Sequence, residues 1–184
     1  MASRSLAERW TYDEFAALPD DGNRYEVIAG ELYVTPAPRT AHQEVLARLI
    51  EIAGPFVRRN GLGRMLPGAD VLFGPGDYLE PDIFFVRRGR TDLVSRRGVE
   101  GAPDLVVEIL SDSTAARDRG LKRERYAHFG VAEYWIIDVD ARQIEIHRPG
   151  ERLPRIERDT LRWQPVLDGP VLEIDVQELL SDVE

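Results

Sequence analysis

Apolar and polar positions form distinct blocks along the chain, and the clearest block spans residues 103–138. An apolar run at 105–110 is broken only by Glu108, which is typical of a strand buried on both faces. A charged segment with helical character follows over 114–129, and a second apolar run occupies 134–137. This order of strand, helix and strand predicts a crossover unit whose two strands run parallel.

The region before this block predicts a short helix, a hairpin and a long helix. Residues 11–18 have the pattern of a helix with an N-terminal capping box. Residues 24–35 predict a β-hairpin that turns near Gly30. Thr40 also begins a capping-box spacing, and apolar residues at helical intervals predict a helix that continues to about residue 59.

Shorter segments complete the predicted sheet. Further strands are expected at 64–66, 69–73, 82–86, 143–147 and 171–174, with a helical turn at 176–180. We expect 74–80 to be a loop and 150–162 to be irregular. We expect 87–101 to be a basic loop, with or without one strand or helical turn. The segments 82–86, 104–110 and 133–139 should be central strands of one mixed sheet with flanking helices, which places the fold in the α/β (α+β) class.

One domain is expected to account for all 184 residues. It would comprise an N-terminal helix and hairpin at 11–35, a core at 40–148, and a C-terminal strand and helix at 170–182. No run of about 18 apolar residues predicts a membrane helix, and the first ten residues lack the apolar core of a signal peptide. The chain contains no cysteine. These features favour a cytoplasmic protein without a membrane partner.

Charge is distributed unevenly along the chain. The net charge of −9 argues against indiscriminate nucleic-acid binding. Residues 84–125 nevertheless carry a net charge of +3, whereas the parts before and after carry −5 and −7. A basic zone on an acidic body can hold a phosphate backbone. The alternative is that its arginines are simply solvated.

Two carboxylates stand out from their surroundings. Glu108 lies within an apolar run, where a carboxylate is costly unless it is paired or binds a metal. The alternatives are an arginine partner or a position that faces solvent. Asp82 opens another strand, and the two acids would be neighbours if those strands pair. Oxygen ligands with open positions suit Mg²⁺ or Mn²⁺.

Lys122 is the single lysine in a chain with 24 Lys and Arg residues. Lysine is a compact cation whose pKa can be tuned by its surroundings, whereas arginine is larger and stays protonated. Beside a metal, it could orient or deprotonate water or stabilise charge on phosphorus. Asp118, Lys122 and Tyr126 recur every four residues and should share a helix face. We expect Lys122 to be a surface residue whose replacement changes stability by no more than about 0.5 kcal/mol. The alternative is a solvated lysine that pairs with Asp118.

Other classes of site find little support. The sequence contains neither a P-loop nor a glycine-rich dinucleotide turn after a strand. Its serines lack the context of a nucleophile elbow, and its three histidines lack zinc-site spacing.

Several motifs together resemble a known family. EPDIFFV, GAPDLVVEILSDST, Lys122 with Tyr126 four residues later, and GVAEYWIID resemble the PD-(D/E)XK nuclease superfamily. They look more closely like its Uma-two family of restriction-endonuclease-like proteins, as does the opening WTYDEFAALPDDGNRYEVIAGELYVTPAP. The resemblance covers about 10–150 and implies a restriction-endonuclease-like fold.

The resemblance also implies an activity and a set of site residues. It implies a Mg²⁺- or Mn²⁺-dependent DNA endonuclease, in which Asp82 and Glu108 hold the metal and Lys122 completes the catalytic set. The superfamily pattern puts lysine two residues after the second acid, where this chain has Leu110, so the lysine would have moved onto the helix. Four further residues are second-tier candidates for the site: Glu31, His42, Glu44 and Tyr126.

Two other functions and one assembly state remain open. The fold could be a catalytically inactive nuclease-like module that binds DNA or protein, or a metal-dependent hydrolase of a small phosphorylated substrate. We expect a homodimer, because cleavage of a duplex needs two cuts and a two-fold axis places one site on each strand. The apolar hairpin around 25–34 would supply contact surface.

Overall fold

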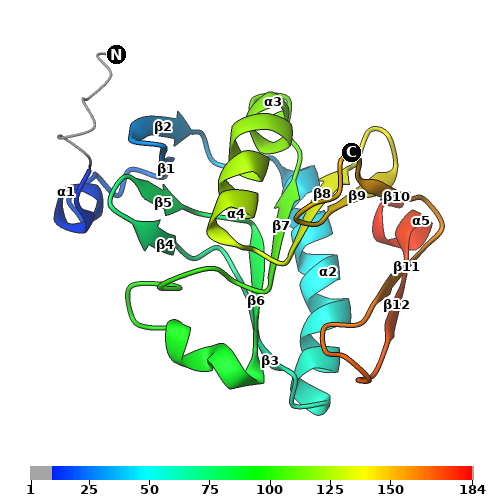
Figure 1. The fold of residues 1–184 in the computed structure, drawn as a ribbon. Coiled ribbons are helices and arrows are strands. Elements are labelled where there is room, and N and C mark those ends of the chain that lie inside the picture. Colours follow the sequence, from blue (N-terminus) through cyan, green and yellow to red (C-terminus); the bar gives the residue numbers. More distant parts are fainter. Residues whose placement is uncertain (1–9, 184) are drawn as a thin grey trace.

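A six-stranded mixed sheet forms the centre of the protein, which a computed structural model describes over residues 10–183 (Figure 1). In pairing order its strands are β10 (Arg155–Glu157), β9 (Gln143–His147), β8 (Glu133–Asp138), β7 (Leu105–Ile109), β6 (Ile83–Arg87) and β3 (Gly63–Pro67). β7 and β8 are parallel, and the other neighbours are antiparallel. The predicted mixed sheet and its three central strands are therefore confirmed.

A four-stranded antiparallel sheet lies beside the central one. Its order is β2 (Glu31–Thr35), β1 (Arg24–Ile28), β5 (Asp77–Leu79) and β4 (Val71–Gly74). The predicted hairpin is confirmed, because β1 pairs with β2 and the turn residues Ala29 and Gly30 both have positive φ.

The strand β5 lies in a segment expected to be a loop, so that expectation is wrong. Asp77 accepts a hydrogen bond from the Ala29 N–H at 2.9 Å and forms an ion pair with Arg125. Leu79 is fully buried. Contacts with residues far away in the sequence therefore fix this strand, and its local pattern does not reveal them.

A third, two-stranded sheet consists of β11 (Thr160–Trp163) and β12 (Leu172–Asp175). β12 confirms the strand expected at 171–174. The segment 150–162 was expected to be irregular, but it contains β10 and most of β11. Leu161 and the adjoining Trp163 are buried in the largest apolar cluster of the described residues, so tertiary packing orders this segment.

The helices test the capping boxes that the sequence predicted. They are α1 (Tyr12–Ala16), α2 (Thr40–Arg59), the 3-10 helix η1 (Arg88–Leu93), α3 (Ala115–Arg117), the π-helical turn η2 (Asp118–Lys122), α4 (Arg123–Phe129) and α5 (Val176–Leu179). The capping box of α1 is confirmed. The capping box expected at Thr40 is wrong, because α2 begins one position earlier than expected and Arg39 is its N-cap.

The crossover connection was expected to be one helix over 114–129, but it consists of α3, η2 and α4. A π-helical turn closes hydrogen bonds one residue later than an α-helical turn, and such turns are frequent at functional sites. The spacing of charged residues cannot distinguish it from a continuous α-helix. The turn contains the two buried charged residues Asp118 and Lys122.

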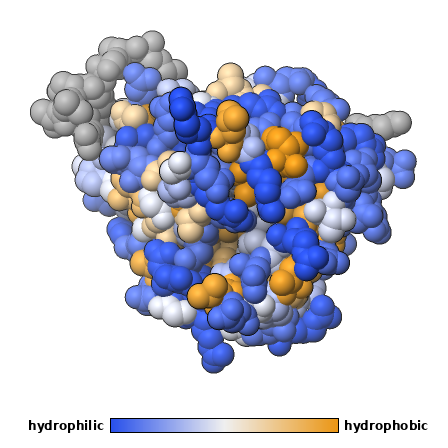
Figure 2. All heavy atoms as spheres, turned by 45° about the vertical axis from the view of Figure 1, so that its right-hand side comes forward, coloured by the Kyte–Doolittle hydropathy of each residue, from blue (hydrophilic) through white to orange (hydrophobic). Residues whose placement is uncertain are grey.

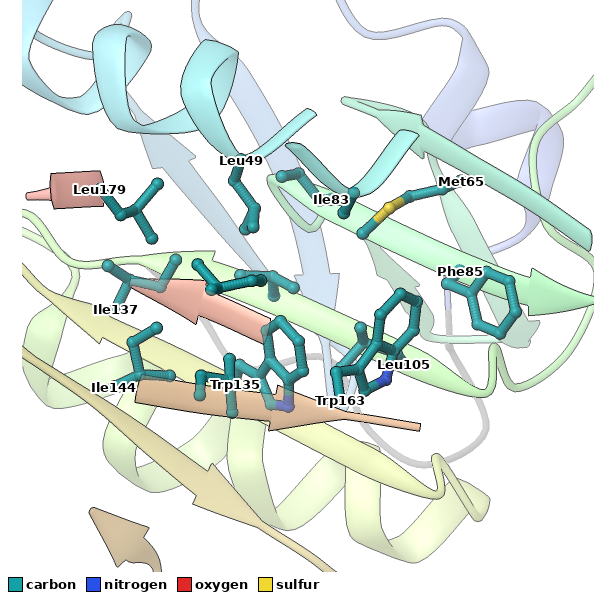
Figure 3. Close-up of a cluster of buried hydrophobic side chains, with 14 of the residues drawn as sticks. Leu49, Met65, Ile83, Phe85, Leu105, Trp135, Ile137, Ile144, Trp163 and Leu179 are labelled. Carbon is teal, nitrogen blue, oxygen red and sulfur yellow. The ribbon is translucent and has the colours of Figure 1, made fainter. Parts of the chain in front are cut away.

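The central sheet is covered on both faces. On one face, α2, α5 and the two-stranded sheet bury an apolar cluster in which Leu49, Trp163 and Leu179 meet Phe85 and Trp135 (Figure 3). On the other face, α4 and the four-stranded sheet bury a second cluster that includes Tyr126 and Ile136. The outer surface in Figure 2 is mainly hydrophilic, with small separate apolar patches.

Alternation along two strands sends both candidate acids to the second face. In β7, Val107 packs into the first cluster and Val106 into the second, so Glu108 shares the face of Val106. In β6, Ile83 packs on the first face and Phe84 does not, so Asp82 also faces away from α2.

None of the helices described within residues 10–183 is both long and apolar enough to cross a lipid bilayer.

Candidate active site

A pocket of about 290 Å³ lies where the hairpin, the start of α2 and the crossover segment meet. These segments lie near the upper end of the molecule in Figure 1. Residues 35–39 and residues 111–114 contribute to the lining of the pocket. Asp82, Glu108 and Lys122 line the pocket together. Three segments that are distant in the sequence thus converge on the residues that the sequence pattern selected.

Pairing between β6 and β7 places the two candidate acids side by side. Ile83 pairs with Val107 in antiparallel register. Continuing that register by one position sets Asp82 opposite Glu108, on the same face of the sheet. Side chains in such directly opposed positions are close neighbours. The expected juxtaposition of the two strands is therefore confirmed.

Three groups hold Asp82, whose side chain is 1% exposed. Arg24 Nη1 donates to Oδ1 at 2.8 Å, and the Ile109 N–H donates to Oδ2 at 2.7 Å. His42 Nε2 lies 2.9 Å from Oδ2. Burial raises the pKa of Asp82, but His42, Arg24 and the Ile109 N–H together lower it below its ordinary value. Asp82 is therefore an ionised carboxylate that is fixed in orientation.

Glu108 is bound by two groups from the crossover segment. Lys122 Nζ lies 2.5 Å from Glu108 Oε1, and the Tyr126 hydroxyl donates to the same oxygen at 2.9 Å. Burial raises the pKa of Glu108 well above its ordinary value; Lys122 opposes this effect, while Asp118 adds to it. Lys122 is therefore the neighbour that favours the charged form of Glu108. Lys122 and Tyr126 both reach Glu108, which agrees with the prediction that they share a helix face.

Glu26 is a member of this cluster that the sequence interpretation missed. Its Oε1 lies 2.7 Å from Lys122 Nζ and accepts the Glu80 N–H at 3.0 Å. Glu26 is 1% exposed. A signal was present, because Glu26 shares a strand face with Ile28, which is buried in the second apolar cluster. A carboxylate on an apolar strand face is the same feature that singled out Glu108.

Asp118 adds a further carboxylate at the same point. Its Oδ1 lies 3.9 Å from Lys122 Nζ, and the side chain is 2% exposed. Oδ1 is buried without a hydrogen-bond partner among the described residues. Burial raises the pKa of Asp118, and Lys122 partly opposes that shift. One ammonium group thus faces three carboxylates, those of Glu26, Glu108 and Asp118.

The environment of Lys122 corrects one expectation. Its side chain is 2% exposed, so the prediction of a surface lysine is wrong. Burial lowers the pKa of Lys122, but Glu108, Glu26 and Asp118 raise it overall above its ordinary value. The side chain is therefore a permanent cation. This environment favours an electrostatic role over removal of a proton from water.

The second-tier candidates divide into two groups. His42 and Tyr126 contact Asp82 and Glu108 directly, as described above. Glu31 is exposed at the turn end of β2, where it accepts a hydrogen bond from Tyr33. Glu44 is exposed on α2, and its carboxylate lies 3.8 Å from Arg48. Glu31 and Glu44 do not line the pocket.

The donor chemistry of the cluster fits a hard divalent cation. Asp82, Glu108 and Asp118 present carboxylate oxygens, which Mg²⁺ and Mn²⁺ prefer. The unpartnered Oδ1 of Asp118 is the kind of buried atom that such an ion would satisfy. Within residues 10–183, however, no three His, Asp or Glu side chains are already arranged around a common metal position. Ion binding therefore requires the salt bridges of Arg24 and Lys122 to rearrange.

Comparisons with known proteins show the family and the fold of the chain. The model of the Uma2 family, described as "Putative restriction endonuclease", matches residues 12–177. A crystal structure from Anabaena variabilis, described as a "putative nuclease belonging to DUF820", superimposes with a TM-score of 0.78 at 21% identity. The superposition covers 92% of this chain and 96% of the other. No curated protein matches the chain significantly.

Proposed function

The chain belongs to the Uma2 family, and from that membership and the buried acid–lysine cluster we propose that it is a metal-dependent DNA endonuclease. The observation that carries the proposal is the meeting of Asp82, Glu108 and Lys122 at one pocket. Two neighbouring strands supply the acids, and the crossover segment between parallel strands supplies the cation. This set is suited to hydrolysis of a phosphodiester bond.

Asp82 and Glu108 would hold Mg²⁺ or Mn²⁺. A divalent ion at this position supplies positive charge beside a phosphate and lowers the pKa of a water molecule. Arg24 and His42 keep Asp82 ionised and oriented, and its carboxylate would donate an oxygen to the ion once the Arg24 salt bridge rearranges. Lys122 would supply a permanent cation to stabilise the negative charge that develops on the phosphate oxygens.

His42 is the better candidate for accepting a proton. The ionised Asp82 carboxylate can only accept hydrogen bonds, so Nε2 of His42 must carry a hydrogen. In the neutral ring, Nδ1 then has a free lone pair. Nδ1 is buried without a partner among the described residues, and His42 lines the pocket. We therefore assign the proton-accepting role to His42 and the charge-stabilising role to Lys122.

A plasmid assay tests the proposal. Wild-type protein with Mg²⁺ or Mn²⁺ should nick or linearise supercoiled DNA, and a chelator should stop the reaction. Glu108→Gln and Asp82→Asn should abolish cleavage, while Glu44→Gln serves as the control because Glu44 is exposed outside the pocket. Cleavage that persists at the wild-type rate in Glu108→Gln would exclude this site.

The second candidate function is a nuclease-like fold that binds DNA or protein without cleaving it. The observation in its favour is that Arg24 and Lys122 already neutralise Asp82 and Glu108. In that case the buried salt bridges would have a structural role alone. Titration with Mn²⁺ separates the two functions, because an inactive fold of this kind would bind DNA but would not bind the ion.

A further inference from the structure

Four arginines without carboxylate partners gather at the end of the molecule opposite the pocket. Arg58 and Arg59 lie in the last turn of α2, Arg64 in β3, and Arg88 at the start of η1. We call these four side chains the basic edge. All four are exposed, and none forms an ion pair with another residue in the described range 10–183.

Backbone contacts bring together the segments that carry the basic edge. The Arg88 N–H donates to the Leu62 carbonyl at 2.7 Å, and the Gly61 N–H donates to the Arg58 carbonyl at 3.1 Å. The end of α2 and the start of η1 therefore meet, and Arg64 follows in the adjoining strand. In Figure 1 these segments form the lower end of the molecule, whereas β2, α3 and the start of α2 lie at the upper end.

Acidic residues are sparse in the segments that form this surface, where Asp92 of η1 is exposed and forms no ion pair with another residue of the range 10–183. The segments 52–69 and 83–91 contain no Asp or Glu. Among the described residues, the carboxylate that forms ion pairs here is Asp104, which binds Arg87 and Arg90 and leaves the basic edge unneutralised. The whole chain carries a net charge of −9. Acids are therefore plentiful elsewhere, and this local excess of positive charge will concentrate polyanions.

Helix α2 connects the basic edge to the pocket. His42, near its start, contacts Asp82, and Arg58 lies in its last turn. At 1.5 Å per residue, the two positions are about 24 Å apart along the helix axis. The same length of B-DNA contains roughly seven base pairs at 3.4 Å each.

We propose that the basic edge is a second nucleic-acid contact surface, which binds DNA phosphates roughly seven base pairs from the strand held at the pocket. Guanidinium groups bind phosphate oxygens in a planar, two-point geometry that favours this ligand. The choice of DNA over another polyanion rests on the proposed function, but the binding itself does not require cleavage. An acidic protein surface is the competing partner.

The test compares two variants that lose the same charge. In the first, all four basic-edge arginines become glutamine. In the second, four exposed arginines of the C-terminal region become glutamine: Arg152, Arg155, Arg158 and Arg162. Affinity for a 24-base-pair duplex is measured by fluorescence anisotropy between 50 and 200 mM salt, without divalent ions so that no cleavage occurs.

We expect the basic-edge variant to bind the duplex about 10- to 100-fold more weakly at low salt, and its log–log salt slope to fall by about 3 to 4. The control variant should stay within about threefold of wild type. Equal losses in both variants, no loss in the first, or no DNA binding by wild type would overturn the proposal. So would a loss of poly-L-glutamate binding without a loss of duplex binding, because that result identifies an acidic partner.

The same proteins distinguish this proposal from the proposed nuclease activity. If wild type with Mg²⁺ leaves plasmid intact while the basic-edge variant still loses duplex affinity, the activity fails and the second surface stands. If wild type cleaves plasmid and both variants bind the duplex as wild type does, the activity stands and the second surface fails.

Discussion

Nζ of Lys122 lies 2.5 Å from Oε1 of Glu108, and the two side chains are only 2% and 3% exposed. One residue comes from a π-helical turn and the other from the strand that precedes it. Removing one partner of a buried ion pair leaves the other charge without compensation, which typically costs about 3–5 kcal/mol. Under the proposed function, stability and catalysis would therefore depend on the same contact.

Lys122→Ala should reduce both the free energy of unfolding and the cleavage rate. We expect a loss of about 3–5 kcal/mol in urea unfolding, because Glu26 and Glu108 lose their ammonium partner. The cleavage rate should fall by about 10²- to 10⁴-fold. The triple variant Glu26→Gln, Glu108→Gln, Lys122→Met should recover part of the stability and none of the activity. Equal instability of the triple and single variants would contradict this explanation.

Lys122→Arg should also fail to cleave DNA, although it preserves the charge. A guanidinium group is larger and planar, and the site around Lys122 is closed to solvent. The plasmid assay, run beside circular dichroism to verify folding, measures the effect. Normal cleavage by this variant, in a preparation where Glu108→Gln is inactive, would remove Lys122 from the catalytic set and leave the acids in place.

Asp82→Asn should abolish binding of Mn²⁺. The carboxylate supplies an oxygen that an amide replaces poorly for a hard cation, and Arg24 would lose its partner. Calorimetric titration of wild type, Asp82→Asn and the control Glu44→Gln gives the comparison. Because binding is measured directly, the result does not depend on activity. Equal affinity in all three proteins would exclude Asp82 as a ligand.

The sequence predicted the fold and selected three residues that meet at one pocket, because its motifs resemble a known family and each of the three residues breaks a local pattern. Glu108 interrupts an apolar strand, Asp82 opens one, and Lys122 is the single lysine. Tyr126 followed from its helical spacing and from its position four residues after Lys122 in the family resemblance. These features are defined by the residues next to each position in the chain, so they can be recognised from the sequence.

The remaining features depend on contacts between distant segments. The burial of Lys122 results from the hairpin that brings Glu26 over the crossover segment. β5 exists because β1 and β4 pair with it on either side. The π-helical turn leaves no trace in the spacing of charges. Tertiary packing determines all three, and local periodicity does not contain that information.

Asp70 should make the protein less stable as the pH rises through mildly acidic values. Burial, together with the charge of Glu26, raises the pKa of Asp70 to about 6 from 3.8. The folded state therefore binds this proton more tightly than the unfolded state. The Asp70 contribution to stability should be greatest below about pH 4, decrease between pH 4 and 6, and be constant above pH 6.

Asp70→Asn should remove that decrease and stabilise the protein at pH 7.5. We expect a gain of about 1–2 kcal/mol, reduced from the full linkage value because Asp70 is partly exposed. Urea midpoints at pH 4.5, 6 and 7.5 measure the effect, with Asp112→Asn as a control at an exposed carboxylate. Parallel pH profiles for wild type and Asp70→Asn would contradict the assignment.

A homodimer remains a prediction, and the hairpin offers a position at which to test it. Val34 in β2 is 43% exposed and belongs to the apolar hairpin expected to form the contact. Light scattering should give twice the 20.9 kDa chain mass at high micromolar concentration. Val34→Arg should shift the population toward monomer. A wild-type mass of one chain at that concentration would count against the dimer.

The burial of the single lysine has a practical consequence for chemical labelling. Residues 1–184 contain one side-chain amine, and it belongs to Lys122, which is 2% exposed. Reagents that acylate lysine therefore have no ready target among the side chains of the folded surface. The rate at which such a reagent modifies Lys122 therefore measures how often the buried cluster around Lys122 opens to solvent. Mass spectrometry of the labelled peptide, with and without Mn²⁺, would show whether an ion keeps this interior amine closed or releases it.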